Sequence, residues 1–322
     1  MQTLIQNTRA YSLVENEKAR GGLSHAYLLA IDDERNLKEA LKAFAKLFFH
    51  CDSESAQARV SRLIDEEHFS DCLFFPEDNK RFAVEDAEKI IEESMLKPVE
   101  GDEKIFIIAD FALSTPQAQN KILKLLEEPP KGVRFLLGTT SVFPVLTTVL
   151  SRVKTLEIPP FSEKEIQQSL QRIYKDKYPQ TDIELCAAAS GGSLGAAENM
   201  LEGGAYKQLL EDAFALAGAN EKDIPLLIKK VGDTKRKKEL ISLLRLIWRD
   251  SLLIKSVLGK GVLLESEKSR LKQIAEKRSA AALVFAQESA SKAEKEVTFN
   301  AYFPQCLELL LASVLRENKR NV

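Results

Sequence analysis

Hydrophobic and polar positions in the first 160 residues form two patterns, short apolar runs and stretches with helical spacing. Apolar runs typical of buried parallel strands occur at 26–30, 71–76, 104–109, 134–139 and 155–158. Stretches with an apolar residue every three or four positions lie at 37–49, 84–95, 116–128 and 144–150. Strands that alternate with helices over short connections predict an α/β fold, with a parallel sheet that carries helices on both faces.

Beyond Pro160 the strand signal ends and helical patterns remain. Ser162 and Glu165 have the spacing of a capping box, which predicts a helix start. Further helical stretches follow at 183–189 and 194–201, and from Tyr206 onward, including 240–257 and 301–315. The predicted organisation is an α/β domain at 1–160, a small helical domain at 161–205 and a larger all-α domain at 206–322.

Composition excludes several functional classes. The chain has 322 residues, 44% of them apolar, and its formal net charge is −2, so no global basic field would recruit nucleic acid. No apolar run reaches the roughly 18 residues of a membrane span, and the N-terminal segment has no apolar core of signal-peptide type. The four cysteines are too scattered for a disulfide framework. We therefore expect a cytoplasmic protein without a membrane partner.

Four motifs carry a resemblance to a known family. They are His25-Ala26-Tyr27-Leu28, Phe44-Ala45-Lys46, Leu125-Leu126-Glu127-Glu128-Pro129-Pro130 and Ser151-Arg152. In this order they resemble the AAA+ clamp-loader subunits of bacterial DNA polymerase III. The resemblance implies an AAA+ α/β domain at 1–160, a helical lid at 161–205 and a helical collar at 206–322 through which subunits would assemble.

The phosphate-binding loop of that family is degenerate here. A P-loop reads G-x-x-x-x-G-K-[ST] and would cover residues 31–38. Its glycine positions hold Ile31 and Asn36, its lysine position holds Leu37, and its hydroxyl position holds Lys38. Bulky side chains at the glycine positions keep backbone N–H groups away from a phosphate, and the acidic run at 32–34 would repel one. We predict that this turn holds no nucleotide.

Two further parts of an ATPase site are also missing. Relatives end the strand at 105–108 with Asp-Glu, which serve Mg²⁺ and the attacking water, whereas this chain has Ala109 and Asp110. Asp110 is open to two interpretations, a remnant metal ligand or a helix N-cap. The turn Gly192-Ser193-Leu194-Gly195 lacks the arginine with which relatives sense the γ-phosphate. The chain alone is expected to have no ATPase activity and no cofactor.

This pattern resembles the delta-prime subunits of the family, which keep the AAA+ scaffold without the motor. The resemblance implies that Arg152, beside Ser151, is an arginine finger for the ATP site of a neighbouring subunit. An arginine supplied in trans accelerates comparable nucleotide hydrolysis by roughly 10³–10⁵. The residues alone also allow a surface arginine at a helix C-terminus. Val153 stands where the family motif has a cysteine.

The implied partners are the gamma/tau ATPase subunits and the delta subunit of the clamp loader. The sliding clamp and primer–template DNA would be reached through that complex, so the chain would belong to a DNA polymerase holoenzyme, a nucleotidyltransferase. Two alternatives stay open. One is an active clamp-loader ATPase of the gamma/tau type, and the other is an AAA+-like adaptor outside replication.

Two residue groups allow a functional and a structural interpretation. Four residues are potential zinc ligands: His50, Cys51, His68 and Cys72. They lack the paired C-x₂₋₄-C spacing of structural zinc sites, so no metal is expected. The basic cluster from Lys229 to Lys238 could contact DNA phosphates, although such a run more often forms a solvated surface.

Other notable residues are expected to be structural. Thr139, at the end of a predicted strand, is expected to cap a helix. Trp248 and the segment Leu307–Leu311 are expected to pack in the helical core or against a neighbouring subunit.

Overall fold

The computed structural model describes residues 1–51, 53–76, 81–202, 206–256, 261–298 and 301–320. The chain divides into two compact units, Met1–Pro160 and Phe161–Val322.

A five-stranded parallel sheet in the order β2-β3-β4-β1-β5 forms the centre of the first unit. Its strands are β1 (Ala26–Ile31), β2 (Cys72–Phe75), β3 (Lys104–Ile108), β4 (Val133–Thr139) and β5 (Lys154–Ile158). The central strands are apolar along nearly their whole length because both faces of the sheet are buried. This sheet confirms the predicted α/β fold, and each strand lies within one residue of its predicted range.

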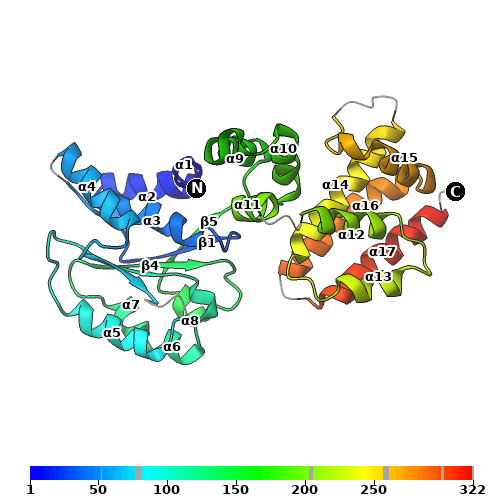
Figure 1. Ribbon diagram of the computed structural model, residues 1–322. Coiled ribbons are helices and arrows are strands. Elements are labelled where there is room, and N and C mark those ends of the chain that lie inside the picture. Colours follow the sequence, from blue (N-terminus) through cyan, green and yellow to red (C-terminus); the bar gives the residue numbers. More distant parts are fainter. Residues whose placement is uncertain (52, 77–80, 203–205, 257–260, 299–300, 321–322) are drawn as a thin grey trace. The chain divides into compact units, whose positions relative to one another are not determined.

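Helices cover both faces of the sheet (Figure 1). One group lies above it in the figure: α1 (Gln2–Gln6), α2 (Arg9–Ala19), α3 (Leu37–Phe48) and α4 (Glu54–Asp65). The other group lies below it: α5 (Val84–Ser94), α6 (Pro116–Lys121), α7 (Leu123–Glu127) and α8 (Thr147–Leu150). The strand pleat divides the core between the groups, so that Leu28, Phe106 and Phe135 pack in the cluster that also contains residues of α5–α8.

Helix α3 starts very close to the sheet. Its apolar face includes the buried residues Leu37, Leu41 and Phe44. A Cβ atom at Gly138 of β4 would stand 2.6 Å from Cδ1 of Leu41 and 3.2 Å from Cδ1 of Leu37. Only glycine therefore fits under the first turns of α3, and this close approach fixes the position of the β1–α3 turn.

Two predicted helices differ from the observed ones. The helix predicted at 116–128 begins as expected, with the Thr115 side chain accepting the Ala118 N–H at 3.2 Å. It is interrupted at Ile122, where ψ is −3° and the helix splits into α6 and α7. The helix predicted at 144–150 begins only at Thr147, because Leu146 is extended with ψ 139° and its N–H bonds the Gln119 side chain.

Three helices of the first unit were not predicted. These are α1, α2 and α4. In α2 the buried residues are Ala10 and Val14, and in α4 they are Val60 and Ile64, so each helix offers a weak apolar pattern.

The second unit is helical over its described residues. Its helices are α9 (Glu163–Tyr174), α10 (Gln180–Ala189), α11 (Leu194–Glu202), α12 (Tyr206–Ala217), α13 (Ile224–Val231), α14 (Lys237–Lys255), α15 (Lys268–Lys277), α16 (Ala280–Thr298) and α17 (Phe303–Arg320). It also contains the 3₁₀ turns η2 (Lys175–Lys177) and η3 (Glu265–Glu267), while a third 3₁₀ turn, η1 (Phe111–Leu113), belongs to the first unit. Ser162 forms the predicted capping box with Glu165. Trp248 on α14 is fully buried, as are Leu307, Leu310 and Leu311 on α17 to within a few per cent.

Helix α14 packs against α12, α15 and α16, while α9, α10 and α11 pack on one another. The predicted boundary between a lid and a collar falls between residues 205 and 206. Because residues 203–205 lie outside the described residues, that division stays a prediction. Val257, the predicted end of the helix that became α14, also lies outside them. Among the described residues, no helix is both long and apolar enough to cross a membrane.

Candidate functional site

The turn between β1 and α3 closes on one of its own carboxylates. Asp33 is 3% exposed, and its Oδ1 accepts the backbone N–H of Asn36 at 3.0 Å. The Asn36 amide also reaches Oδ1 and Oδ2 at 3.4 and 3.3 Å, and Asn36 is the N-cap residue of α3. The Asp33 carboxylate thus lies at the start of α3, where backbone N–H groups favour an anion.

Ile31 and Leu37 flank this turn and belong to the core. Ile31 ends β1 at 4% exposure, and Leu37 opens α3 at 3%. Both side chains are therefore committed to apolar packing, and neither offers the bare backbone or the cation that a triphosphate requires.

Lys38 points to a different set of groups. Its Nζ lies 2.6 Å from a carboxylate oxygen of Glu67 and 5.6 Å from the centre of the Phe74 ring. Glu67 also pairs with Lys42 at 3.0 Å, and these two lysines hold the pKa of Glu67 below its ordinary value against the opposing effect of burial. Lys38 is thus part of an ion-pair cluster that ties α3 to the end of the α4 region.

Asp110 lies two residues after the end of β3, at the edge of the sheet where the β1–α3 turn lies. Its backbone is left-handed, with φ 44° and ψ 59°, and it is the N-cap residue of η1 without a side-chain capping bond. Its Oδ1 is buried and has no protein hydrogen-bond partner. Burial, together with the charge of Glu34 from the β1–α3 turn, raises the pKa of Asp110.

Ala109, predicted from the sequence to stand with Asp110 in a degenerate Asp-Glu pair, only continues the backbone of the sheet. Its N–H donates to the carbonyl of Phe75 at 3.0 Å, and its methyl group supplies no ligand. Asp110 and Glu34 therefore bring two carboxylates near each other here. In the part of the chain that the structure describes, no three His, Cys, Asp or Glu side chains gather as a metal site.

Thr139, at the end of β4, does not cap a helix. Its hydroxyl donates to the Ser141 carbonyl and accepts the Ser141 N–H at 3.1 Å, which closes a tight local turn. The prediction of a helix-capping hydroxyl is wrong here because the next helix, α8, begins only at Thr147.

Arg152 occupies the opposite edge of the sheet. It follows α8 and comes two residues before β5 begins at Lys154, so it lies at the amino ends of the parallel strands. The β1–α3 turn and Asp110 lie at the carboxyl ends. A five-residue strand spans about 16 Å, so Arg152 is separated from the β1–α3 turn of its own chain.

The Arg152 guanidinium is held by several groups of its own chain. Its Nε and Nη2 donate to Oε2 of Glu127 on α7 at 3.0 and 2.9 Å. Its Nη1 donates to the Thr148 carbonyl at 3.0 Å and to the Ser151 hydroxyl at 3.3 Å. The Arg152 side chain is 30% exposed and that of Glu127 57%. The arginine therefore lies at the surface but folds back over the end of α8.

The start of α8 is braced from the core. Gln119 of α6 is 1% exposed, and its Oε1 accepts the Leu146 N–H at 2.9 Å while its Nε2 approaches the Pro144 carbonyl at 3.4 Å. The buried Val149 anchors α8 itself in the core cluster. This bracing fixes the backbone that carries Ser151 and Arg152.

The four potential zinc ligands differ in their burial. Cys72 is buried on β2, and burial raises the pKa of its thiol, whereas Cys51 is half-buried and both His50 and His68 are exposed. Nearby Phe49 and Phe69 stack edge-on, with ring centres 4.9 Å apart. This segment is therefore organised by apolar packing.

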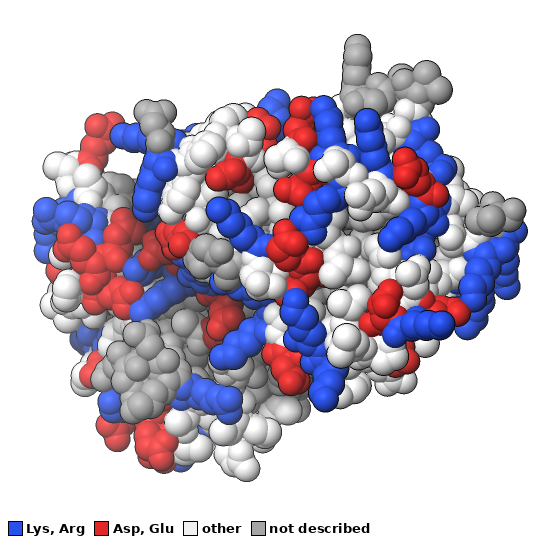
Figure 2. Space-filling view, turned by 45° about the vertical axis from the view of Figure 1, so that its right-hand side comes forward, with Lys and Arg blue, Asp and Glu red and all other residues white. Residues whose placement is uncertain are grey.

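The basic cluster at 229–238 is partly occupied by contacts within the second unit. Lys230 pairs with Asp212 at 2.6 Å, and Lys237 lies 5.9 Å from the centre of the Phe303 ring. On the face shown in Figure 2, basic and acidic side chains are interspersed. Contact of this cluster with DNA stays a prediction.

The turn at Gly192–Gly195 is a compact link between α10 and α11. The Gly192 carbonyl accepts the Phe161 N–H at 2.9 Å, and the Ser193 hydroxyl accepts the Ala196 N–H at 3.2 Å. Gly191, just before it, has φ +64°, and a Cβ there would meet Glu294 and Ser242. Gly192 has φ +88°, so backbone geometry explains the glycines at 191 and 192.

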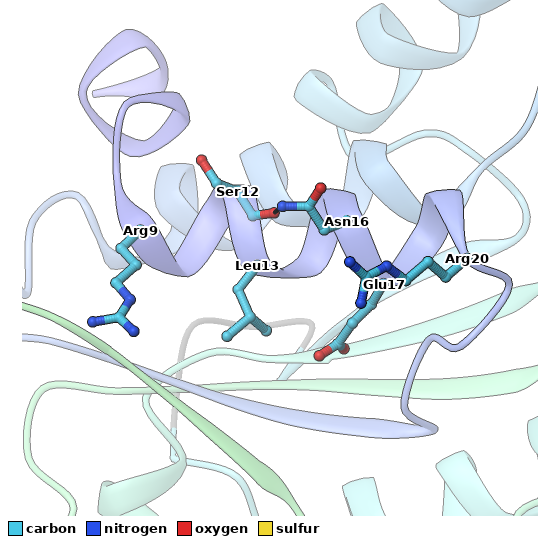
Figure 3. Close-up of a pocket in the computed structure, with 6 residues that line it drawn as sticks. All are labelled: Arg9, Ser12, Leu13, Asn16, Glu17 and Arg20. Atoms are coloured by element: carbon cyan, nitrogen blue, oxygen red, sulfur yellow. Dashed lines mark hydrogen bonds between the residues drawn. The ribbon is translucent and has the colours of Figure 1, made fainter.

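An open hollow of about 400 Å³ lies along α2 (Figure 3). It is lined by Arg9, Ser12, Leu13, Asn16, Glu17 and Arg20. Arg9, Leu13 and Glu17 extend to one side of the helix, and Tyr27 donates to Glu17 at 2.6 Å. Arg9 and Arg20 are eleven residues, or about 16 Å, apart along the helix. The hollow is open and is lined by residues of this segment alone, and we assign no ligand to it.

Comparison with known proteins identifies relatives. Residues 6–162 match the family described as "DNA polymerase III, delta subunit". The DNA polymerase III subunit gamma of Buchnera aphidicola subsp. Schizaphis graminum is 24% identical over 95% of this chain and 93% of its own. The DNA polymerase III subunit delta' of Bacillus subtilis is 29% identical, over half of each chain.

Among solved structures, a DNA polymerase III gamma subunit-related protein of Thermotoga maritima is similar over 95% of this chain and 99% of its own. The TM-score is 0.41 and the sequence identity 18%.

Residues 6–162, which contain the whole parallel sheet, are thus similar to the family described as "DNA polymerase III, delta subunit". Relatives of this chain carry the names gamma, tau and delta'.

Two residues of the site were not singled out from the sequence. Asp33 was noted only as part of an acidic run, and Glu127 only as part of a motif. The signal for Asp33 is its position three residues before the N-cap Asn36, a spacing that suits a side-chain bond to the backbone. Glu127 has no local signal, because its partner is 25 residues away.

Proposed function

We propose that this chain is a delta-prime-like, non-ATPase subunit of the DNA polymerase III clamp loader. It contributes Arg152, beside Ser151, to the ATP site of a neighbouring gamma/tau-type subunit and so helps to load the sliding clamp on primed DNA. The observation that carries this proposal is the β1–α3 turn, which is closed by Asp33 while Lys38 is paired with Glu67. A turn filled by its own carboxylate cannot also cradle a triphosphate.

The position of Arg152 supports the second half of the proposal. It lies at the sheet edge opposite the degenerate turn, which suits an arginine that acts on another chain. Its guanidinium is at the surface on a braced backbone, as a finger must be if it is to meet a phosphoryl group in a defined place.

The proposal extends to partners and location. The collar at 206–322 joins this chain to the gamma/tau and delta subunits, and the chain meets the clamp and primer–template DNA through the complex, in the cytoplasm. The chain holds no nucleotide or metal cofactor of its own, at the degenerate residues Ile31, Asn36, Leu37, Lys38, Ala109 and Asp110 in particular.

A second candidate is an active ATPase of the gamma/tau type. The gamma subunit match over 95% of this chain favours it. It requires the turn at 31–38 to bind Mg²⁺·ATP without glycines or a phosphate lysine. A third candidate, an AAA+-like adaptor outside replication, requires that the chain act apart from clamp-loader subunits.

One set of measurements separates the three. The purified chain is titrated with Mg²⁺·ATP by calorimetry, and then mixed with gamma/tau and delta subunits, a sliding clamp and primed DNA. We expect no ATP binding by the chain alone, stable assembly, and DNA-stimulated ATP hydrolysis that depends on Arg152. Saturable ATP binding by the chain supports the gamma/tau alternative, and failure to assemble supports the adaptor.

A further inference from the structure

The Arg152 guanidinium has almost no donor left for an external ligand. Arginine carries five N–H donors. Two of them, on Nε and Nη2, go to Oε2 of Glu127, and Nη1 reaches the Thr148 carbonyl and the Ser151 hydroxyl. One Nη2 hydrogen remains. A two-point contact with a phosphoryl group therefore requires that Arg152 first release Glu127 or one partner of Nη1, and a side chain that extends away from α8 releases both.

The arginine is folded back on the helix that precedes it. Its Nη1 bonds the carbonyl of Thr148, four residues earlier, so the head group lies over the C-terminal end of α8. Such a contact is favourable, because the carbonyl end of a helix attracts a cation. The side chain is therefore retracted toward its own chain.

The side chain is the part that can move, because the backbone is fixed. The buried side chain of Gln119 accepts the Leu146 N–H, and Val149 of α8 is fully buried in the core. The carboxylate that retains the guanidinium is by contrast 57% exposed. A surface ion pair of this kind is weak and exchanges readily.

We propose that Glu127 holds Arg152 in a retracted resting position, and that Arg152 extends only when a triphosphate in the neighbouring subunit replaces the carboxylate. This inference rests on the proposed function, in which Arg152 acts in trans. A phosphoryl group carries more negative charge than one carboxylate and accepts the arginine fork at two oxygens, so it displaces Glu127 when it is in reach. Glu127 is then a positioning residue that makes the arginine respond to the occupancy of the neighbouring site.

The test compares Glu127→Gln with Glu128→Gln in the assembled clamp loader. Glutamine keeps the shape of the side chain but removes the charge that competes with phosphate. Glu128 is the matched control, since it is exposed and adjoins Glu127 on the same turn. We expect Glu127→Gln to lower the ATP concentration for half-maximal hydrolysis about two- to fivefold, the range of a surface ion pair, with kcat unchanged and with no effect of Glu128→Gln.

A second measurement needs no ATPase activity. In the chain alone, the Arg152 Nε–H is followed by ¹⁵N NMR, and its signal is assigned by its loss in Arg152→Lys. Its exchange rate with water should be higher in Glu127→Gln than in the wild type, and unchanged in Glu128→Gln.

The outcomes separate this inference from the proposed function. If Arg152→Ala leaves hydrolysis by the complex unchanged, the proposed function fails. If Arg152→Ala abolishes the stimulation while Glu127→Gln matches the wild type or raises the ATP requirement, the arginine works in trans but Glu127 does not restrain it, and this inference is overturned. An unchanged Nε–H exchange rate in Glu127→Gln also overturns it.

Discussion

Replacing Asp33 tests whether the β1–α3 turn is held shut by its own carboxylate. Asp33 is 3% exposed, and its Oδ1 accepts the Asn36 N–H at 3.0 Å. A hydrogen bond to a charged acceptor contributes about 1.5–3 kcal/mol, and an anion near a helix N-terminus adds about 0.3–1 kcal/mol. Asp33→Ala is therefore expected to lower the free energy of unfolding of the first unit by about 2–3 kcal/mol.

Two further variants calibrate this effect. Asp33→Asn keeps an oxygen acceptor but loses the charge, so it should lose about 1 kcal/mol. Glu34→Ala removes an exposed carboxylate from the same turn and should change stability by less than about 0.5 kcal/mol.

Urea unfolding provides the assay, followed by circular dichroism and by tryptophan fluorescence. Trp248 is the chain's single tryptophan and is buried in the second unit, so its fluorescence follows that unit and serves as an internal control. Asp33→Ala should shift the dichroism transition while the fluorescence midpoint stays in place. It should also fail to gain Mg²⁺·ATP binding, because the glycines remain absent.

The reasoning is refuted if Asp33→Ala is as stable as Glu34→Ala. It is equally refuted if Asp33→Ala binds Mg²⁺·ATP, since opening the turn would then be sufficient to restore a nucleotide site.

Three further predictions follow from individual residues. Gly138→Ala should lower the free energy of unfolding in urea by about 1–3 kcal/mol, because its Cβ would stand 2.6 Å from Leu41. Gly101→Ala is the control and should be nearly neutral, since a Cβ there meets nothing within 4 Å. Equal urea midpoints for the two variants would contradict the close approach of α3. Burial and the nearby Glu34 raise the pKa of Asp110, so the folded state retains that proton to a higher pH than the unfolded state, and ionisation lowers stability at neutral pH. Asp110→Asn should therefore stabilise the chain by about 1 kcal/mol at pH 7, with the gain shrinking as the pH falls toward about 4; a gain that grows toward acid would show the opposite sign of the pKa shift. Burial raises the pKa of Cys186 to about 12 and also raises the pKa of Cys72 and of Cys306, and all three thiols are buried. Cys51 is half-buried and is therefore the most accessible of the four thiols. A disulfide reagent at pH 8 should modify one cysteine rapidly in the native chain, and none in Cys51→Ser.

The central strands β1, β3 and β4 could be predicted from the sequence because each is a short apolar run that is buried on both faces. The edge strands β2 and β5 are only partly buried, and their shorter apolar runs were still sufficient to predict them. Helix starts with a chemical signal were also predictable, such as Thr115 before Pro116 and the capping box of Ser162. The interruption at Ile122 was not, because Ile122 is a buried apolar residue that fits a continuous helical pattern.

The site was only partly predictable. The absence of P-loop residues at 31–38 can be read directly from the residue types. The way in which the turn is filled could not be read, since it depends on the Asp33 side chain turning back to the Asn36 N–H. The pair between Glu127 and Arg152 joins two surface residues from different helices, so it needs the tertiary fold.

We propose that this chain supplies an arginine to a neighbour's ATP site and has no such site itself. The most direct test is single-turnover ATP hydrolysis in a clamp loader in which the only intact ATP site faces this chain. We predict that Arg152→Ala slows hydrolysis at that site by roughly 10³-fold or more, within the range for arginine fingers, while ATP stays bound there. An unchanged rate constant at that site would contradict the account.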